Sequence, residues 1–130
     1  PSLSLITLNA FTASETILVP IQCEYYALEG LSQLLETVKQ VKRLYNPPLE
    51  LEGVVLTMYD SRLNLTLQVA AEVRKFFEEK VYQTEIPRNV TVSEAPSYGK
   101  PVQYYDNTSR GSEAYTDLAK EFLKNQKGRS

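Results

Sequence analysis

Residues 19–30 constrain the fold more than any other part of the sequence. They join the end of an apolar, β-branched run, through a short polar turn, to a segment whose leucines recur at helical spacing. A nearly continuous apolar strand that leads into an amphipathic helix is typical of α/β proteins with a parallel sheet. Ligands of such sheets bind beyond the carboxyl ends of the strands, so we expect this junction to form the wall of a site.

The rest of the chain continues this alternation of strands and helices. Residues 16–22, 51–58 and 81–86 predict three strands, each an apolar run bounded by turn signals. Helices are expected near residues 5–11, over 24–45, after Asn64 as N-cap, and over 112–124. A Pro- and Gly-bearing loop is expected over residues 87–101.

Two of these helices carry apolar stripes at three- and four-residue spacing. The predicted stripe of the third helix is Val69, Ala70, Val73, Phe76 and Phe77. The predicted stripe of the last helix is Tyr115, Leu118, Ala119, Phe122 and Leu123. Glu50 and Glu52 are expected to be solvated, and Cys23 is expected to be a packed, inert thiol.

Strands separated by helices of more than ten residues predict right-handed crossovers and a mostly parallel sheet. The expected fold class is therefore α/β, as a single segment over residues 1–130 with a frayed tail at 126–130. Three strands would leave an apolar edge uncovered, so the chain is expected to be one half of a doubly wound domain and to associate through that edge.

Composition excludes several classes of site. The formal net charge is −2, so any nucleic-acid contact must come from a local cluster of basic side chains. Without histidine and with one cysteine, the chain cannot build mixed Cys/His zinc sites or a Ser-His-Asp triad, and we predict neither metal ligands nor catalytic residues. Apolar runs are far shorter than the roughly 20 residues that cross a bilayer, and no leader is expected, which favours a reducing, cytosolic setting.

Residues 19–30 also match a sequence motif of a known family, as do Ile86-Pro-Arg-Asn-Val90, Ser93-Glu-Ala-Pro-Ser97 and Gly99-Lys-Pro101. The chain resembles, over nearly its whole length, the ParA/Soj partitioning ATPases, which are relatives of MinD. The resemblance implies the C-terminal half of a P-loop NTPase-like domain. It places the phosphate loop and the catalytic Asp upstream of Pro1, and no Gly-rich, Lys-containing loop occurs in these 130 residues.

The same resemblance implies site residues. Met58, Pro87, Arg88 and Asn89 would flank the adenine of a nucleotide, although Pro-Arg-Asn after a strand is also an ordinary turn. Arg62 in the Asp-x-Arg turn would contact DNA, with help from Lys100 and Arg110. A further arginine of the family is replaced by Thr91 here, and a lone surface arginine is more often simply solvated.

Two functions are therefore expected as alternatives. In the first, the chain is the C-terminal part of an ATPase for chromosome or plasmid partitioning. The intact protein would use ATP and magnesium, dimerise, bind DNA non-specifically, meet a ParB-type partner and act at the nucleoid without a membrane. Residues 24–45 and 93–101 would help to form its dimer and partner surfaces. In the second, the chain is a non-catalytic interaction module that pairs with a ParA-like protein. In both, this chain alone is predicted to bind no cofactor tightly and to hydrolyse no ATP.

Overall fold

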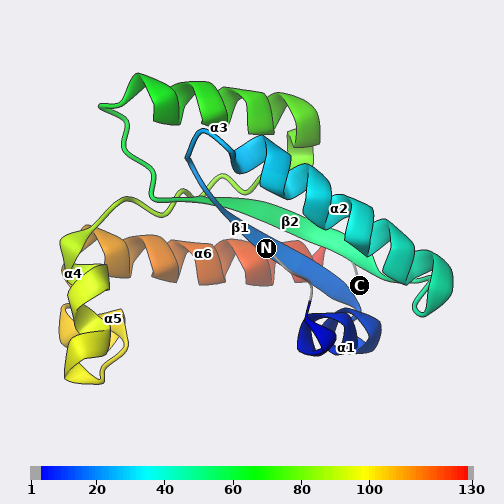
Figure 1. Ribbon diagram of the computed structural model, residues 1–130. Helices are drawn as coiled ribbons and strands as arrows, with labels where there is room; N and C mark the ends of the chain where they lie inside the picture. Colours follow the sequence, from blue (N-terminus) through cyan, green and yellow to red (C-terminus); the bar gives the residue numbers. More distant parts are fainter. Residues whose placement is uncertain (1–3, 129–130) are drawn as a thin grey trace.

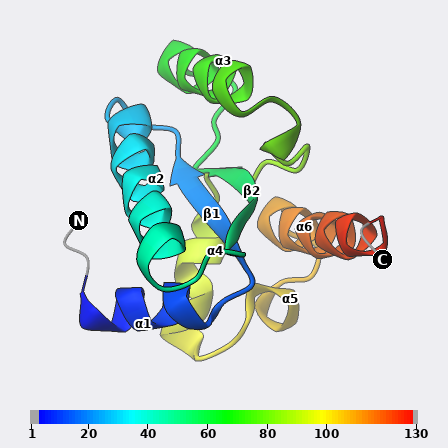
Figure 2. The same cartoon turned by 90° about the vertical axis from the view of Figure 1, so that its right-hand side faces the viewer.

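Two parallel strands, β1 and β2, form the centre of the computed structural model, which describes residues 4–128 (Figure 1). Helices α2 and α3 cover one face of the sheet and α6 covers the other (Figure 2). The elements in chain order are α1 (Leu5–Ala13), β1 (Thr16–Gln22), α2 (Ala27–Leu44), β2 (Glu50–Thr57), α3 (Asn64–Phe77), η1 (Glu78–Lys80), α4 (Val90–Glu94), η2 (Ala95–Tyr98), α5 (Val102–Tyr105) and α6 (Arg110–Lys127). The predicted α/β class is confirmed.

The core follows the alternation of the strands. On one face, Val54 and Leu56 of β2 pack against the α3 residues Val69, Ala70 and Val73. On the other face, Val55 packs with Tyr82, Ile86 and Ala114 of α6. The predicted stripes hold only in part, because Phe76 is 74% exposed and both Ala119 and Leu123 face solvent.

The prediction of a third regular strand over residues 81–86 is wrong. This segment runs beside β2 but touches it only at its two ends, where Tyr82 N donates to Val54 O (2.8 Å) and Ile86 N to Leu56 O (2.8 Å). Between these two hydrogen bonds β2 advances by two residues, from Val54 to Leu56, whereas the segment advances by four, from Tyr82 to Ile86. In a regular parallel pair both strands advance by the same number of residues. The middle of the segment therefore bows away from the sheet.

Smaller predictions also need correction. Leu63, not Asn64, is the N-cap of α3, and the expected loop over residues 87–101 contains α4 and η2. The last helix reaches Lys127, so residues 126 and 127 are helical rather than frayed. Residues 1–3 and 129–130, which include the start of the resemblance and the end of the expected tail, lie outside the described residues. Over residues 4–128, none of the helices has the length and apolar character to cross a membrane.

A β-bulge in β2 explains the burial of Glu52, which was expected to be solvated. Ile17 pairs with Leu51 and the next β1 residue, Leu18, pairs with Gly53, so Glu52 is the extra residue. The bulge changes the phase of the strand, and the Glu52 side chain enters the interior at 3% exposure. There Glu52 Oε1 accepts a hydrogen bond from the Tyr82 hydroxyl at 2.9 Å.

We expect the fold to lose stability at alkaline pH because of the Tyr82 hydroxyl. Burial, with the hydrogen bond to Glu52, raises its pKa from 10.0 to about 12, so folding favours the neutral phenol. The stabilisation that the neutral Tyr82 hydroxyl gives the folded state is complete below pH 10 and is lost as the pH rises through 12. Two units correspond to about 2 to 3 kcal/mol of unfolding free energy. We expect wild type to exceed Tyr82→Phe in stability at pH 8 and this difference to shrink towards pH 12.

Urea titrations of both proteins at several pH values, in a Cys23→Ala background, measure this effect. The background removes the buried Cys23 thiol, whose pKa is raised from 9.0 to about 11 and which would titrate in an overlapping range. Comparison with Tyr82→Phe cancels the titration of the other tyrosines. A stability difference that stays constant from pH 8 to 12 would contradict the prediction.

Candidate functional site

A polar cleft of about 820 Å³ lies beyond the carboxyl end of β2. Its walls come from the turn after β2, from residues 83–88 and from the first turns of α6. The first two walls are joined through Tyr59, whose N–H donates to Ile86 O (3.0 Å) and whose carbonyl accepts from Arg88 N (3.0 Å). The charged residues in the walls are Asp60, Arg62, Glu85, Arg88, Arg110, Glu113 and Asp117.

The cleft gathers residues that the resemblance had assigned to two separate contacts. Arg62 and Arg110, expected at DNA, line it together with Pro87 and Arg88, expected at the nucleotide. Three arginines from three distant segments thus face one hollow. This position agrees with the rule that ligands of parallel sheets bind beyond the strand ends.

The other three expected site residues are not among those that line the cleft. Met58 follows β2 with φ of 51°, an uncommon conformation for a residue with a side chain, and is 38% exposed. Asn89 caps α4, where its Oδ1 accepts from Val92 N at 3.1 Å. Lys100 is exposed directly after Gly99. The Oδ1 atom of Asn89 is therefore already used as an acceptor within the fold.

Asp60 fixes the direction of Arg62. The two oxygens of Asp60 accept from Arg62 Nε and NH2, each at 2.9 Å, and Asp60 Oδ1 also accepts from the Arg62 backbone N–H at 3.1 Å. These hydrogen bonds lower the pKa of Asp60 to about 2, so the carboxylate stays ionised at neutral pH. The Arg62 side chain remains 86% exposed and keeps donors for an outside anion.

The start of α6 approaches the Asn89 turn very closely at Gly111. A Cβ atom at this position would overlap the Val92 side chain and lie 3.1 Å from Asn89 Oδ1. Only glycine lets α6 pack here, and this packing sets the place of Arg110 next to the turn that carries Arg88.

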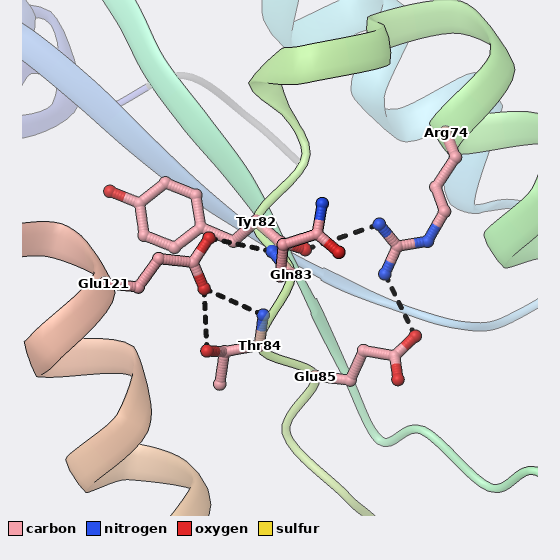
Figure 3. A network of polar contacts seen from close by, with 6 residues as sticks. All are labelled: Arg74, Tyr82, Gln83, Thr84, Glu85 and Glu121. Atoms are coloured by element: carbon pink, nitrogen blue, oxygen red, sulfur yellow. Dashed lines mark hydrogen bonds and ion pairs between the residues drawn. The ribbon is translucent and has the colours of Figure 1, made fainter. Parts of the chain in front are cut away.

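A carboxylate from α6 holds the bowed segment beside the cleft (Figure 3). Glu121 accepts from the backbone N–H of Gln83 (2.8 Å), from the backbone N–H of Thr84 (2.8 Å) and from the Thr84 hydroxyl (2.7 Å). On the opposite side, Arg74 of α3 pairs with Glu85 at 3.0 Å. These contacts join positions 11 to 38 residues apart, so they leave no local pattern from which the sequence could predict them.

The site contains no activated thiol. Cys23 is 6% exposed, and burial raises its pKa to about 11, with a smaller contribution from the charge of Glu85. The expected packed thiol is confirmed. Within the part of the chain that the structure covers, no group of three or more Cys, Asp and Glu side chains is arranged to hold a metal ion.

Comparison with known proteins gives a consistent family. A family model described as an AAA domain matches residues 1–51. The sporulation initiation inhibitor protein Soj of Bacillus subtilis is 61% identical over 125 residues, covering 96% of this chain and 49% of that protein. The chromosome partitioning protein ParA of Caulobacter vibrioides is 54% identical over 129 residues, covering 99% of this chain and 48% of that protein. The chain spans about half the length of the curated relatives it matches.

Solved structures share the fold. Cobyrinic acid a,c-diamide synthase from Mycobacterium smegmatis, with bound ADP and magnesium, has a TM-score of 0.75 and 33% identity over 100% of this chain and 46% of its own. The cell division ATPase MinD of Pyrococcus furiosus has a TM-score of 0.72 over 95% of this chain and 48% of its own, and at 24% identity it shows the fold alone. The sequence identities above decide the family: this chain belongs to the ParA/Soj family of chromosome partitioning proteins.

Proposed function

We propose that this chain is the C-terminal half of a ParA/Soj-type partitioning ATPase, and that its cleft binds the base end of ATP and the phosphates of DNA. The observation that carries this proposal is the convergence of Arg62, Arg88 and Arg110 at the carboxyl end of β2. Guanidinium groups pair with phosphate oxygens and stack on planar bases, so both ligands suit this set. With a net charge of −2, any nucleic-acid contact must come from a local group of basic side chains such as this one.

The nucleotide contacts proposed for this half are on the base side. The Pro87 turn is fixed to Tyr59 by two backbone hydrogen bonds of 3.0 Å, which makes a rigid rim for a planar ring. Met58 and Asn89 flank that rim in sequence, and the Asn89 amide keeps donors for a base edge. The 130 residues contain no phosphate loop, so we assign the triphosphate, the magnesium and hydrolysis to the other half of the domain.

The uncovered edge of β1 supports the same assignment. Among residues 4–128, β1 pairs only with β2, and its other edge has no strand beside it. Parallel sheets are rarely left open, since unpaired backbone groups next to apolar side chains invite another strand. We propose that the remaining half of the domain pairs there. The intact protein would then dimerise, meet a ParB-type partner and act in the cytoplasm on the nucleoid.

The test compares this chain with the same chain extended upstream through a phosphate loop. We expect ATP binding, and hydrolysis stimulated by DNA, only in the extended protein. Filter binding with ATP and a phosphate-release assay with and without non-specific duplex DNA measure both. If the extended protein neither binds nor hydrolyses ATP, the ATPase proposal fails and the chain is better described as a non-catalytic interaction module.

A further inference from the structure

The bowed segment between Tyr82 and Ile86 determines where the Pro87 turn begins. The Tyr82 and Ile86 amides bond to Val54 O and Leu56 O, which are two residues apart on β2. The segment thus contains two residues more than a regular strand would use. If those two residues joined the sheet, everything after them would slide along β2 by about 6 to 7 Å, at roughly 3.3 Å per residue. A shift of two residues keeps each side chain on its own face, so alternation alone does not oppose it.

Glu121 occupies the donor that such a shift needs. Its carboxylate accepts from the Gln83 and Thr84 backbone amides at 2.8 Å each and from the Thr84 hydroxyl at 2.7 Å. The Thr84 amide is the one that a regular strand would donate to Leu56 O, and it is not free to do so. Hydrogen bonds to an ionised acceptor are the stronger kind, and a carboxylate accepts several at once. Arg74 holds the opposite side of the segment through Glu85 at 3.0 Å. After Ile86, the two backbone hydrogen bonds of Tyr59, to Ile86 O and from Arg88 N, place Pro87 opposite Tyr59.

We infer that Glu121 is a positioning residue for the nucleotide base: it keeps residues 83–85 bowed and so holds the Pro87 turn at the rim of the cleft. This inference rests on the proposed binding of ATP at that turn. Glu121 itself is not among the residues that line the cleft, so it acts through the backbone of its neighbours. It also connects the turn to α6, the helix that begins with Arg110.

The discriminating substitution is Glu121→Gln in the full-length protein that contains this chain. A glutamine has one accepting oxygen, and its NH2 group would face a backbone N–H, so the three bonds are not all kept. We expect faster hydrogen exchange at Gln83 and Thr84 and about a tenfold loss in the preference for ATP over GTP, because a displaced turn no longer reads the base. Glu72→Gln, the same change on the exposed face of α3, is the control and should alter neither.

Base preference separates positioning from a purely structural role, since lower stability alone weakens ATP and GTP binding equally. If Glu121→Gln folds poorly, Glu121→Asp keeps the charge but withdraws it by one methylene and should give the same loss of preference. An unchanged ATP-to-GTP ratio in a variant that binds nucleotide would overturn the inference. If wild type shows no base preference or no ATP binding, the proposed function fails as well, while exchange at Gln83 and Thr84 still reports whether Glu121 holds the segment.

Discussion

Replacing Gly53 with valine is expected to destabilise the fold by about 3 kcal/mol or more. A Cβ atom at Gly53 would lie 2.6 Å from Tyr82 Cε1 and 2.8 Å from the carbonyl oxygen of Lys80. Neither neighbour can easily retreat: one is backbone, and the other is a ring at 2% exposure whose hydroxyl is bonded to Glu52. The β-branched side chain would therefore force β2, directly after its bulge at Glu52, away from Lys80 and Tyr82.

Urea denaturation followed by circular dichroism measures this loss as a lower midpoint at an unchanged slope. Gly30→Ala is the matched control, because nothing lies within 4 Å of a Cβ at that position of α2. Alanine in a helix should stabilise by about 0.5 to 1 kcal/mol relative to glycine. The two glycine substitutions are thus expected to move the midpoint in opposite directions, and equal midpoints would contradict the packing described for Gly53.

Local sequence patterns correctly predicted the elements that depend mainly on local sequence, such as β1 and α2. Strand β1 has the bounds expected from its apolar run, and α2 ends before the two prolines at positions 47 and 48, as proline requires. The third strand could not be predicted correctly, because residues 81–86 have strand composition but the amides of Gln83 and Thr84 donate to Glu121, far along the chain. Burial of Glu52 likewise depends on a bulge, which a lone Gly53 in a strand suggests but does not locate.

The candidate site was predictable in part for the same reason. The strand-end rule and the family wording pointed to the turns that carry Arg62 and Arg88, and the structure brings these turns together with Arg110. The pairing of Arg62 with Asp60 follows from their spacing in one turn, but the bidentate geometry does not. Met58 and Asn89 lie next to these turns in sequence without lining the cleft: Met58 has a positive φ, and the Asn89 side chain caps α4. Lys100 follows Gly99 at the end of η2 and does not line the cleft either.

Arg62→Ala is expected to weaken non-specific DNA binding of the full-length protein at least about tenfold at low salt. Each phosphate contact that is lost should also lower the slope of log K against log salt by about one. Arg62 is the strongest candidate because Asp60 holds its Nε and NH2 edge at 2.9 Å, which leaves the 86% exposed guanidinium oriented before any ligand arrives. A pre-ordered arginine loses less side-chain entropy on binding than a free one.

Lys75→Ala is the matched control, since Lys75 is exposed on α3 and does not line this cleft. Both substitutions remove one positive charge, so an effect of net charge alone would be equal in the two proteins. Fluorescence anisotropy with a labelled duplex, measured from low to moderate salt, distinguishes the loss of a phosphate contact from a general loss of positive charge. Only a lost contact changes the slope of log K against log salt by about one. Equal losses for Lys75→Ala and Arg62→Ala would mean that DNA does not enter the cleft, and the three arginines would then be assigned to the nucleotide alone.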